Sequence, residues 1–249
     1  MRIKHRILSL TIICFALAAC GEVIPDLGRL YSFQTPSLDR AASSNQPPVI
    51  LIHGAFGSRL QNKNNKNEIW PGSLRRILFN DYKAVTLPID SETLLPLESG
   101  LEVSGITDRV AGQDFYGQII SVLEDVGGFV RTEPKTPARL GEKRYYVFEY
   151  DWRLDNVESA RDLDRFIEQI REDYQDPKLE VDVIAHSMGG LIARYFVRYG
   201  TVDVLNDNDF PVNNHGAEHL RRVILLGTPN FGSVRAVTIQ SLRGCGSNW

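Results

Sequence analysis

The sequence predicts an α/β fold built on a mostly parallel, doubly wound sheet. Two observations support this prediction. Short apolar runs rich in β-branched residues recur along the chain, and segments with apolar residues at helical spacing lie between them. Such runs are typical of strands buried on both faces, and their alternation with helices is typical of parallel sheets. With 249 residues, 43% of them hydrophobic, the chain is long enough to bury one core.

Four segments are expected to form the strands. The first, at 49–52, is continuously apolar, follows two prolines and ends at His53 and Gly54. Three further runs have the same character and are each followed by turn residues; they lie at 145–148, 181–185 and 223–226.

Two segments are expected to be crossover helices. Residues 159–174 carry a recurring apolar face, formed by Leu163, Phe166, Ile167 and Ile170, with charges on the other side. Residues 191–199 continue apolar directly after a pair of glycines, so the third strand turns straight into a helix.

The stretch 58–141 is too long for a simple crossover. It contains a third helix candidate at 113–126, with an apolar stripe formed by Phe115, Ile119, Ile120 and Leu123. The remainder is expected to build a cap-like excursion over the carboxyl edge of the sheet.

The N-terminus has the features of a secretion signal. Basic residues at 2, 4 and 6 precede an apolar run at 7–19 that is too short for a relaxed membrane span. Residues 1–19 are therefore expected to be a signal peptide, and the chain is expected to be exported.

The apolar run ends in Leu17-Ala18-Ala19-Cys20, which resembles the lipobox of bacterial lipoproteins. This resemblance implies a lipid anchor on Cys20 that holds the protein at the cell envelope, at the outer membrane if the source is Gram-negative. An ordinary signal peptide with a chance cysteine is the alternative. Residues 20–47 have the composition of a tether, and residues 48–249 are expected to form a partial α/β domain.

The segment Ala185-His186-Ser187-Met188-Gly189-Gly190 lies between an expected strand and an expected helix. A G-x-S-x-G-like sequence in this context forms a nucleophile elbow, a tight turn that exposes the serine hydroxyl at the edge of the sheet. Ala185 replaces the first glycine and adds only a methyl group. Ser187 is therefore the expected catalytic nucleophile, and a helix N-cap is its structural alternative.

The segment His53-Gly54-Ala55-Phe56-Gly57-Ser58 follows the first strand, where an α/β-hydrolase places its oxyanion loop. The expected oxyanion donors are the amides of Ala55 and Met188, with Phe56 as the alternative to Ala55. The loop and the elbow together predict the α/β-hydrolase fold.

Five blocks resemble the lecithin:cholesterol acyltransferase group of lipases. In order they are H-G-A-F-G-S-R-L at 53–60, W-P-G-S-L-R-R at 70–76, Y-D-W-R-L at 150–154, A-H-S-M-G-G-L-I-A-R at 185–194 and G-T-P-N-F-G-S at 227–233. The resemblance covers residues 48–240. It implies a lipid or long-chain acyl-ester substrate, an acyl-enzyme on Ser187, and release of the acyl group to water or an alcohol.

A serine nucleophile needs a histidine base and an acid, which follow the serine in this fold. After Ser187 the histidines are His215 and His219, both before the last expected strand, and residues 234–249 contain no Asp, Glu or His. The acid, the base and the last strands are therefore expected to be missing from the chain. An unusual triad that uses His215 or His219 is the alternative within the enzyme class.

Other motifs fit structural roles. Asp151-Trp152-Arg153 fits an ion pair beside a core aromatic residue as well as it fits a substrate contact. The segment 227–229 is expected to support the site, and His53 and His186 are expected to be structural rather than basic catalysts.

No Cys, His and carboxylate cluster has ligand spacing and no glycine loop fits a phosphate, so no metal site and no organic cofactor are expected. The net charge of -3, with both signs interspersed, argues against nucleic acid as a partner. A non-catalytic lipoprotein that binds acyl chains or a partner is the alternative function.

Overall fold

The computed structural model describes residues 46–72, 83–93, 95–110, 113–204, 210 and 212–233. The expected signal peptide, Cys20 and nearly all of the expected tether lie outside these ranges. Within them, no helix combines the length and the apolar character that crossing a membrane requires.

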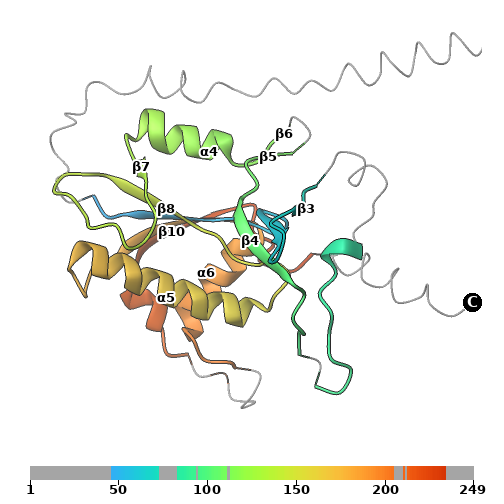
Figure 1. The fold of residues 1–249 in the computed structure, drawn as a ribbon. Coiled ribbons are helices and arrows are strands. Elements are labelled where there is room, and N and C mark those ends of the chain that lie inside the picture. Colours follow the sequence, from blue (N-terminus) through green and yellow to red (C-terminus); the bar gives the residue numbers. More distant parts are fainter. Residues whose placement is uncertain are drawn as a thin grey trace, which may run out of the picture. The chain divides into compact units, whose positions relative to one another are not determined.

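A five-stranded parallel sheet in the order β10-β9-β1-β8-β7 forms the centre of the fold (Figure 1). Its strands are β1 (Val49–Ile52), β7 (Val130–Arg131), β8 (Arg144–Phe148), β9 (Val181–His186) and β10 (Leu220–Leu226). The four predicted strands and their parallel arrangement are confirmed, and β7 is an addition at the edge.

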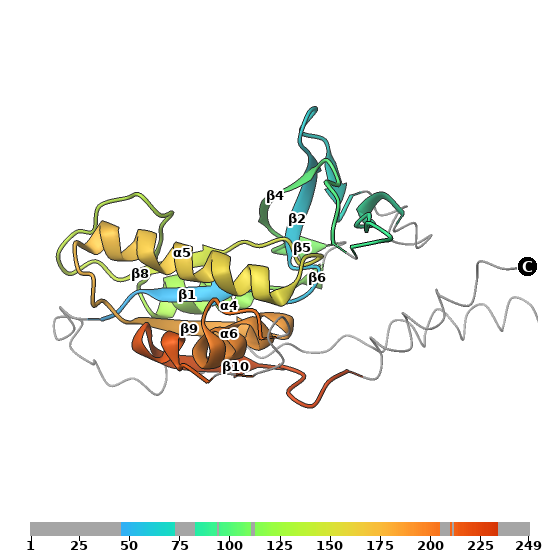
Figure 2. The ribbon, with the colours of Figure 1, turned by 90° about the horizontal axis from the view of Figure 1, so that it is seen from below.

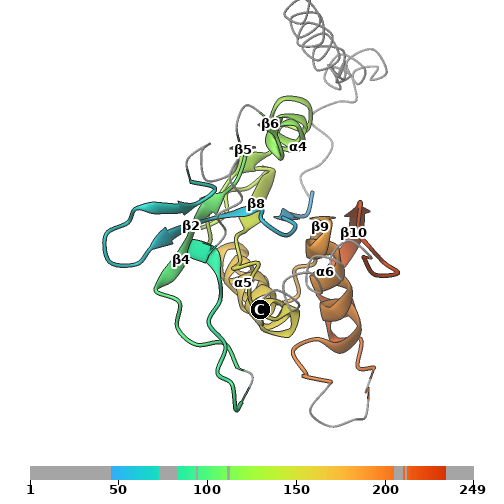
Figure 3. The ribbon, with the colours of Figure 1, turned by 90° about the vertical axis from the view of Figure 1, so that its right-hand side faces the viewer.

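Helices cover both faces of this sheet, which makes it doubly wound (Figures 1 and 3). The helices α5 (Asn156–Tyr174) and α6 (Met188–Tyr199) lie on one face. The short helix α4 (Gly117–Ser121) and the π-helical turn η2 (Val122–Val126) lie on the other. The predicted α/β fold class is therefore confirmed.

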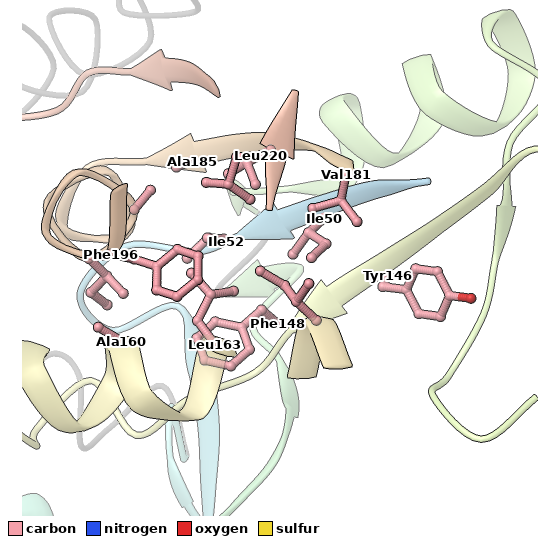
Figure 4. Close-up of a cluster of buried hydrophobic side chains, with 14 of the residues drawn as sticks. Ile50, Ile52, Tyr146, Phe148, Ala160, Leu163, Val181, Ala185, Phe196 and Leu220 are labelled. Carbon is pink, nitrogen blue, oxygen red and sulfur yellow. The ribbon is translucent and has the colours of Figure 1, made fainter. Parts of the chain in front are cut away.

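The central strand β1 is buried on both faces because all four of its residues are apolar. Successive side chains of a strand point to opposite faces, so Ile50 and Ile52 join the core under α5 and α6 (Figure 4), while Val49 and Leu51 join the core under α4 and η2. One strand thus anchors both apolar layers.

Helix α5 begins three residues earlier than its apolar periodicity predicts. Asp155 has an extended backbone, and its carboxylate accepts a hydrogen bond of 2.8 Å from the amide of Val157. The helix ends at Gln175, which adopts the left-handed conformation with φ of 53°.

The prediction of a helix over 113–126 is wrong at its start. Residues Gln113–Asp114 form strand β6, which pairs with β5 (Arg109–Val110), and the helix begins only at Gly117. Asp108 holds the chain extended, because its carbonyl accepts the amide hydrogen of Phe115 at 2.8 Å. Phe115 is consequently 56% exposed, and Tyr116 is buried in its place.

A second, antiparallel sheet in the order β3-β2-β4 rises from the end of β1 (Figure 2). Its strands are β2 (Ser58–Asn62), β3 (Glu68–Trp70) and β4 (Leu101–Ile106), and the short 3-10 helix η1 (Lys83–Val85) lies between β3 and β4. Because β2 follows β1 after five residues, this sheet starts at the carboxyl edge of the central sheet.

Candidate active site

Ser187 occupies a strained turn between β9 and α6. Its φ of 51° and ψ of −120° are rarely adopted by residues other than glycine, and such strain is concentrated at functional sites. Its amide donates a hydrogen bond of 2.8 Å to the carbonyl of Leu226 at the end of β10. The Ser187 side chain makes no capping hydrogen bond to α6, so the N-cap alternative is wrong.

The glycines around this turn are required by close backbone contacts. A Cβ atom at Gly189 would lie 2.4 Å from the carbonyl oxygen of His53, and one at Gly190 would lie 1.9 Å from Thr228 Oγ1. Helix α6 therefore approaches the end of β1 more closely than any side chain allows. The contact with Thr228 also confirms that the segment 227–229 supports the elbow.

The predicted oxyanion loop lies directly beside the serine. A Cβ atom at Gly54 would be 2.8 Å from Ser187 Cβ, and the loop closes through a hydrogen bond of 3.1 Å from the Gly57 amide to the Gly54 carbonyl. Within the described residues, no hydrogen bond uses the amides of Ala55, Phe56 or Met188. The two predicted donors and the alternative donor at Phe56 are thus all available to a ligand.

His53 is buried with both ring nitrogens engaged. The amide of Tyr150 donates to Nε2 at 3.3 Å, so Nδ1 carries the hydrogen and donates to the Gly54 carbonyl at 2.9 Å. Its ring also stacks on the Tyr150 ring at 4.2 Å. Burial lowers the pKa of His53 from 6.5 to about 4. This histidine is a neutral support of the loop, as expected, and has no free nitrogen for base catalysis.

Tyr116 connects the oxyanion loop to the turn that carries Ser187. This residue was not identified from the sequence. The Gly54 amide donates to its hydroxyl at 2.8 Å, and the hydroxyl lies 2.9 Å from Nδ1 of His186. Burial raises the pKa of Tyr116 and lowers that of His186, so both groups stay neutral near pH 7. Tyr116 thereby fixes Gly54 against the elbow and leaves the neighbouring loop amides free.

The variant Tyr116→Phe is expected to lower the free energy of unfolding by about 1–3 kcal/mol, because Gly54 and His186 lose a buried partner. Denaturant unfolding measures this difference. The matched control is Tyr174→Phe, since the buried Tyr174 hydroxyl has no partner among the described residues. Equal losses in the two variants would contradict the bridging role of Tyr116.

Three aromatic rings form a wall beside the oxyanion loop. Phe56 packs on Trp152 at 4.4 Å and on Trp70 at 5.2 Å between ring centroids. Indole hydrogen bonds hold both tryptophans to the loop, from Trp70 to the Phe56 carbonyl at 3.0 Å and from Trp152 to the Ser58 carbonyl at 3.2 Å. The Phe56 side chain is half exposed, so the wall offers apolar surface to a ligand at the loop.

Asp151 and Arg153 form a buried ion pair behind this wall. The guanidinium contacts both carboxylate oxygens, at 2.8 and 2.6 Å, and only 4% of the Arg153 side chain is exposed. A further hydrogen bond of 3.0 Å reaches the Ser99 hydroxyl. Of the two interpretations left open by the sequence, the geometry supports the ion pair.

The histidines that follow the serine lie at the opposite edge of the sheet. His215 begins the 3-10 helix η3 (His215–Glu218), and the His219 carbonyl accepts from the amide of Val181, the first residue of β9. Ser187 follows the last residue of β9, about 20 Å away at the rise of a strand. The alternative triad with His215 or His219 is therefore wrong.

No histidine among the described residues forms a hydrogen bond with the hydroxyl of Ser187. The site thus contains a strained serine, a loop with free amides and an apolar wall; both nitrogens of His53 and Nδ1 of His186 are engaged in structural hydrogen bonds.

Comparisons relate the chain to one protein family and to a solved structure. The model of the family described as lecithin:cholesterol acyltransferase matches residues 142–244. A chain of the Tle4-Tli4 complex is a solved structure similar to this one, at 19% sequence identity and a TM-score of 0.41. The similarity covers 76% of this chain and 47% of that chain, so this chain spans about half of it. None of the curated proteins matches.

The matched segment contains β8, α5, β9, the Ser187 turn, α6 and β10, whereas β1 and the loop at 53–58 lie outside it. Residues 142–244, somewhat less than half of the chain, are thus similar to the family described as lecithin:cholesterol acyltransferase.

Proposed function

We propose that this chain carries the nucleophile of a serine lipase or O-acyltransferase acting on lipid acyl esters. The observation that supports it most is the backbone of Ser187, held at φ 51° with its hydroxyl free of capping bonds. A positive φ at this residue costs folding energy and directs the hydroxyl away from the helix backbone.

In the proposed reaction the Ser187 hydroxyl attacks the ester carbonyl carbon. The negative charge that develops on the carbonyl oxygen is bound by the amides of Met188 and Ala55, or Phe56, which have no competing partner among the described residues. The positive end of the α6 dipole stabilises the same charge. The alcohol leaves, and water or a second alcohol then takes the acyl group from Ser187.

The reaction also needs a base and an acid. Both ring nitrogens of His53 are engaged, Nδ1 of His186 is paired with Tyr116, and His215 and His219 lie at the other end of β9. In this proposal the base and the acid are therefore not among the described residues, and the sequence predicts that they are missing from this chain.

An acyl-ester substrate is favoured by the apolar wall formed by Phe56, Trp70 and Trp152. Aromatic rings beside the oxyanion donors can bury a hydrocarbon chain while the carbonyl faces the loop amides. We further propose that the N-terminal segment, with Cys20 as the lipidated residue, holds this site near a membrane that contains such esters.

A long-chain alkyl fluorophosphonate tests the proposal. We expect one covalent phosphonyl group per chain, placed on Ser187 by peptide mass spectrometry, and faster labelling of Ser187 than of exposed serines because the loop amides bind the phosphonyl oxygen. The variant Ser187→Ala should remain folded and unlabelled, while Ser91→Ala, which changes an exposed serine, should label as the parent does. A parent chain without an adduct would remove the catalytic proposal.

A second function has its own support. Within the described residues, the Ser187 hydroxyl lacks a histidine partner, and a protein that only binds acyl chains needs none. In that case a fluorescent fatty acid should bind with equal affinity to the parent and to Ser187→Ala, and neither should react with the phosphonate.

A further inference from the structure

Two imidazoles and two carboxylates meet at the edge of the sheet far from Ser187. Asp164 and Glu168 are one turn apart on α5, so they lie on the same face of that helix. His215 and His219 are also four residues apart, at the two ends of η3. The nitrogen and oxygen atoms of Asp164, His215 and His219 lie within 4.8 Å of one another.

The hydrogen bonding of His219 leaves one of its nitrogens unprotonated and directed at the carboxylates. Nδ1 lies 2.9 Å from the carbonyl oxygen of His215, which can only accept, so Nδ1 carries the hydrogen. In the neutral ring, Nε2 then presents a lone pair, 3.4 Å from Glu168 Oε1 and 3.9 Å from Asp164 Oδ1. The lone pair of the buried His219 ring repels these carboxylate oxygens, and either a cation or a proton between the atoms removes this repulsion.

The charges around the cluster do not supply that cation. Arg171 contacts Glu168 Oε1 at 2.7 Å and offsets its charge, but Asp164 faces the two imidazoles. The nearby basic residues of α5 have their own partners: Arg161 contacts Glu158, and Arg165 contacts Asp162. One negative charge is therefore left for a bound ion or for protons on the imidazoles.

The separations between the donor atoms fit a small tetrahedral ion. A zinc ion bound at about 2.0–2.1 Å keeps tetrahedral ligands about 3.3 Å apart. The distances are 2.9 Å between Asp164 Oδ1 and His215 Nε2, 3.4 Å between Glu168 and His219, and 3.9 Å between Asp164 and His219. Shifts of about half an ångström would bring these three pairs to this geometry, and the ligand atoms of Asp164, His215 and His219 all lie within 4.8 Å of one another.

The surroundings of the cluster orient its ligands. The two imidazole rings are 4.4 Å apart and both pack edgewise on Phe196 of α6, at 5.8 and 5.7 Å. The hydrogen bond from His219 Nδ1 to a backbone carbonyl is the arrangement that metal-bound histidines usually have. Helices α5 and α6 thus hold the imidazoles before any ion arrives.

We propose that Asp164, His215 and His219 form a structural binding site for zinc or a similar divalent transition metal. Imidazole nitrogens and carboxylate oxygens are suitable ligands for zinc, and the fourth position of a tetrahedral ion is left to water or, after a side-chain movement, to Glu168. The ion would fasten η3, and with it the connection from α6 to β10, onto α5. This site is independent of the function proposed for Ser187.

The sequence alone predicts no metal site because the donors come from two distant segments. His215 and Asp164 are 51 residues apart, and each segment contributes only an i, i+4 pair. The prediction of no metal was based on the spacing of ligands along the chain. This criterion does not detect two i, i+4 pairs that only folding brings together.

Zinc titration of the full chain, stripped by a chelator, tests the site. We expect one Zn²⁺ per chain by calorimetry, a higher thermal midpoint with zinc, and a Co²⁺ complex with the visible absorption of tetrahedral coordination. The variants His215→Ala and Asp164→Asn should each weaken binding at least tenfold. Asp162→Asn, a charge-matched change on the exposed side of α5, should leave the affinity unchanged.

Circular dichroism distinguishes lost ligation from lost folding. His215 is half-exposed, so its variant is expected to keep the parent spectrum while it loses the zinc-dependent shift of the thermal midpoint. Absence of stoichiometric binding in the parent, or equal affinity in the parent and both ligand variants, would overturn the proposal and leave the cluster as a proton-holding ion pair.

Discussion

The variant Asp151→Ala is expected to lose about 3–5 kcal/mol of unfolding free energy. The Arg153 side chain is 4% exposed and makes a two-pronged contact with Asp151. Without the carboxylate, a buried guanidinium keeps its charge and has only the Ser99 hydroxyl as a side-chain partner. Removal of one member of a buried pair costs far more than the pair itself contributes.

Chemical denaturation at neutral pH measures this loss of stability. Two further variants show whether it comes from the unpaired charge. Asp162→Ala removes the same charge from an exposed pair on α5 and should change stability by less than about 1 kcal/mol. The double variant Asp151→Ala/Arg153→Met removes both charges and should recover most of the loss. A double variant as unstable as the single one would show that the pair acts through packing rather than charge.

Acidification from pH 6.5 to pH 4 is expected to destabilise the fold by about 3 kcal/mol through His53 alone. The pKa of His53 is about 4 in the folded chain because the ring is buried, and about 6.5 in the unfolded chain. Above pH 6.5 the ring is neutral in both states, so its full contribution is present. Between pH 6.5 and 4 the unfolded chain takes up the proton first, and stability falls by up to about 1.4 kcal/mol per pH unit.

The variant His53→Gln isolates this contribution, because a glutamine does not titrate. Its unfolding free energy should depend less steeply on pH between 6.5 and 4.5 than that of the parent, although the variant starts from lower stability. Nuclear magnetic resonance of the His53 ring gives a direct check in the parent chain. A ring that titrates near pH 6.5 in the native state would falsify the burial argument.

The strands and helices of the parallel sheet could be predicted because each has a hydrophobic pattern within its own segment of the sequence. Each of the strands β1, β8, β9 and β10 is an apolar run that must be buried, and α5 has a clear apolar face. The elbow was predictable for the same reason, since the glycines that make room for it are adjacent to Ser187 in the chain.

Features that depend on contacts between distant segments could not be predicted. Phe115 and Tyr116 are neighbours of similar size, and only the partners at Gly54 and His186 determine which ring is buried. For this reason the predicted helix begins at residue 113, whereas α4 begins at Gly117. The antiparallel sheet and the cluster around His219 likewise depend on pairings that no single window of sequence contains.

The hydrogen bond from the Ser187 amide to the Leu226 carbonyl couples the elbow to an edge of the sheet. Within the described residues β10 has one neighbouring strand, β9, and its Ile224 side chain is 50% exposed. Edge strands open more readily than central ones, and local opening sets the rate at which amide hydrogens exchange with solvent. The Ser187 amide is therefore protected from exchange only while β10 remains paired with β9. Its exchange rate thus measures the fraction of molecules in which the strained turn is intact.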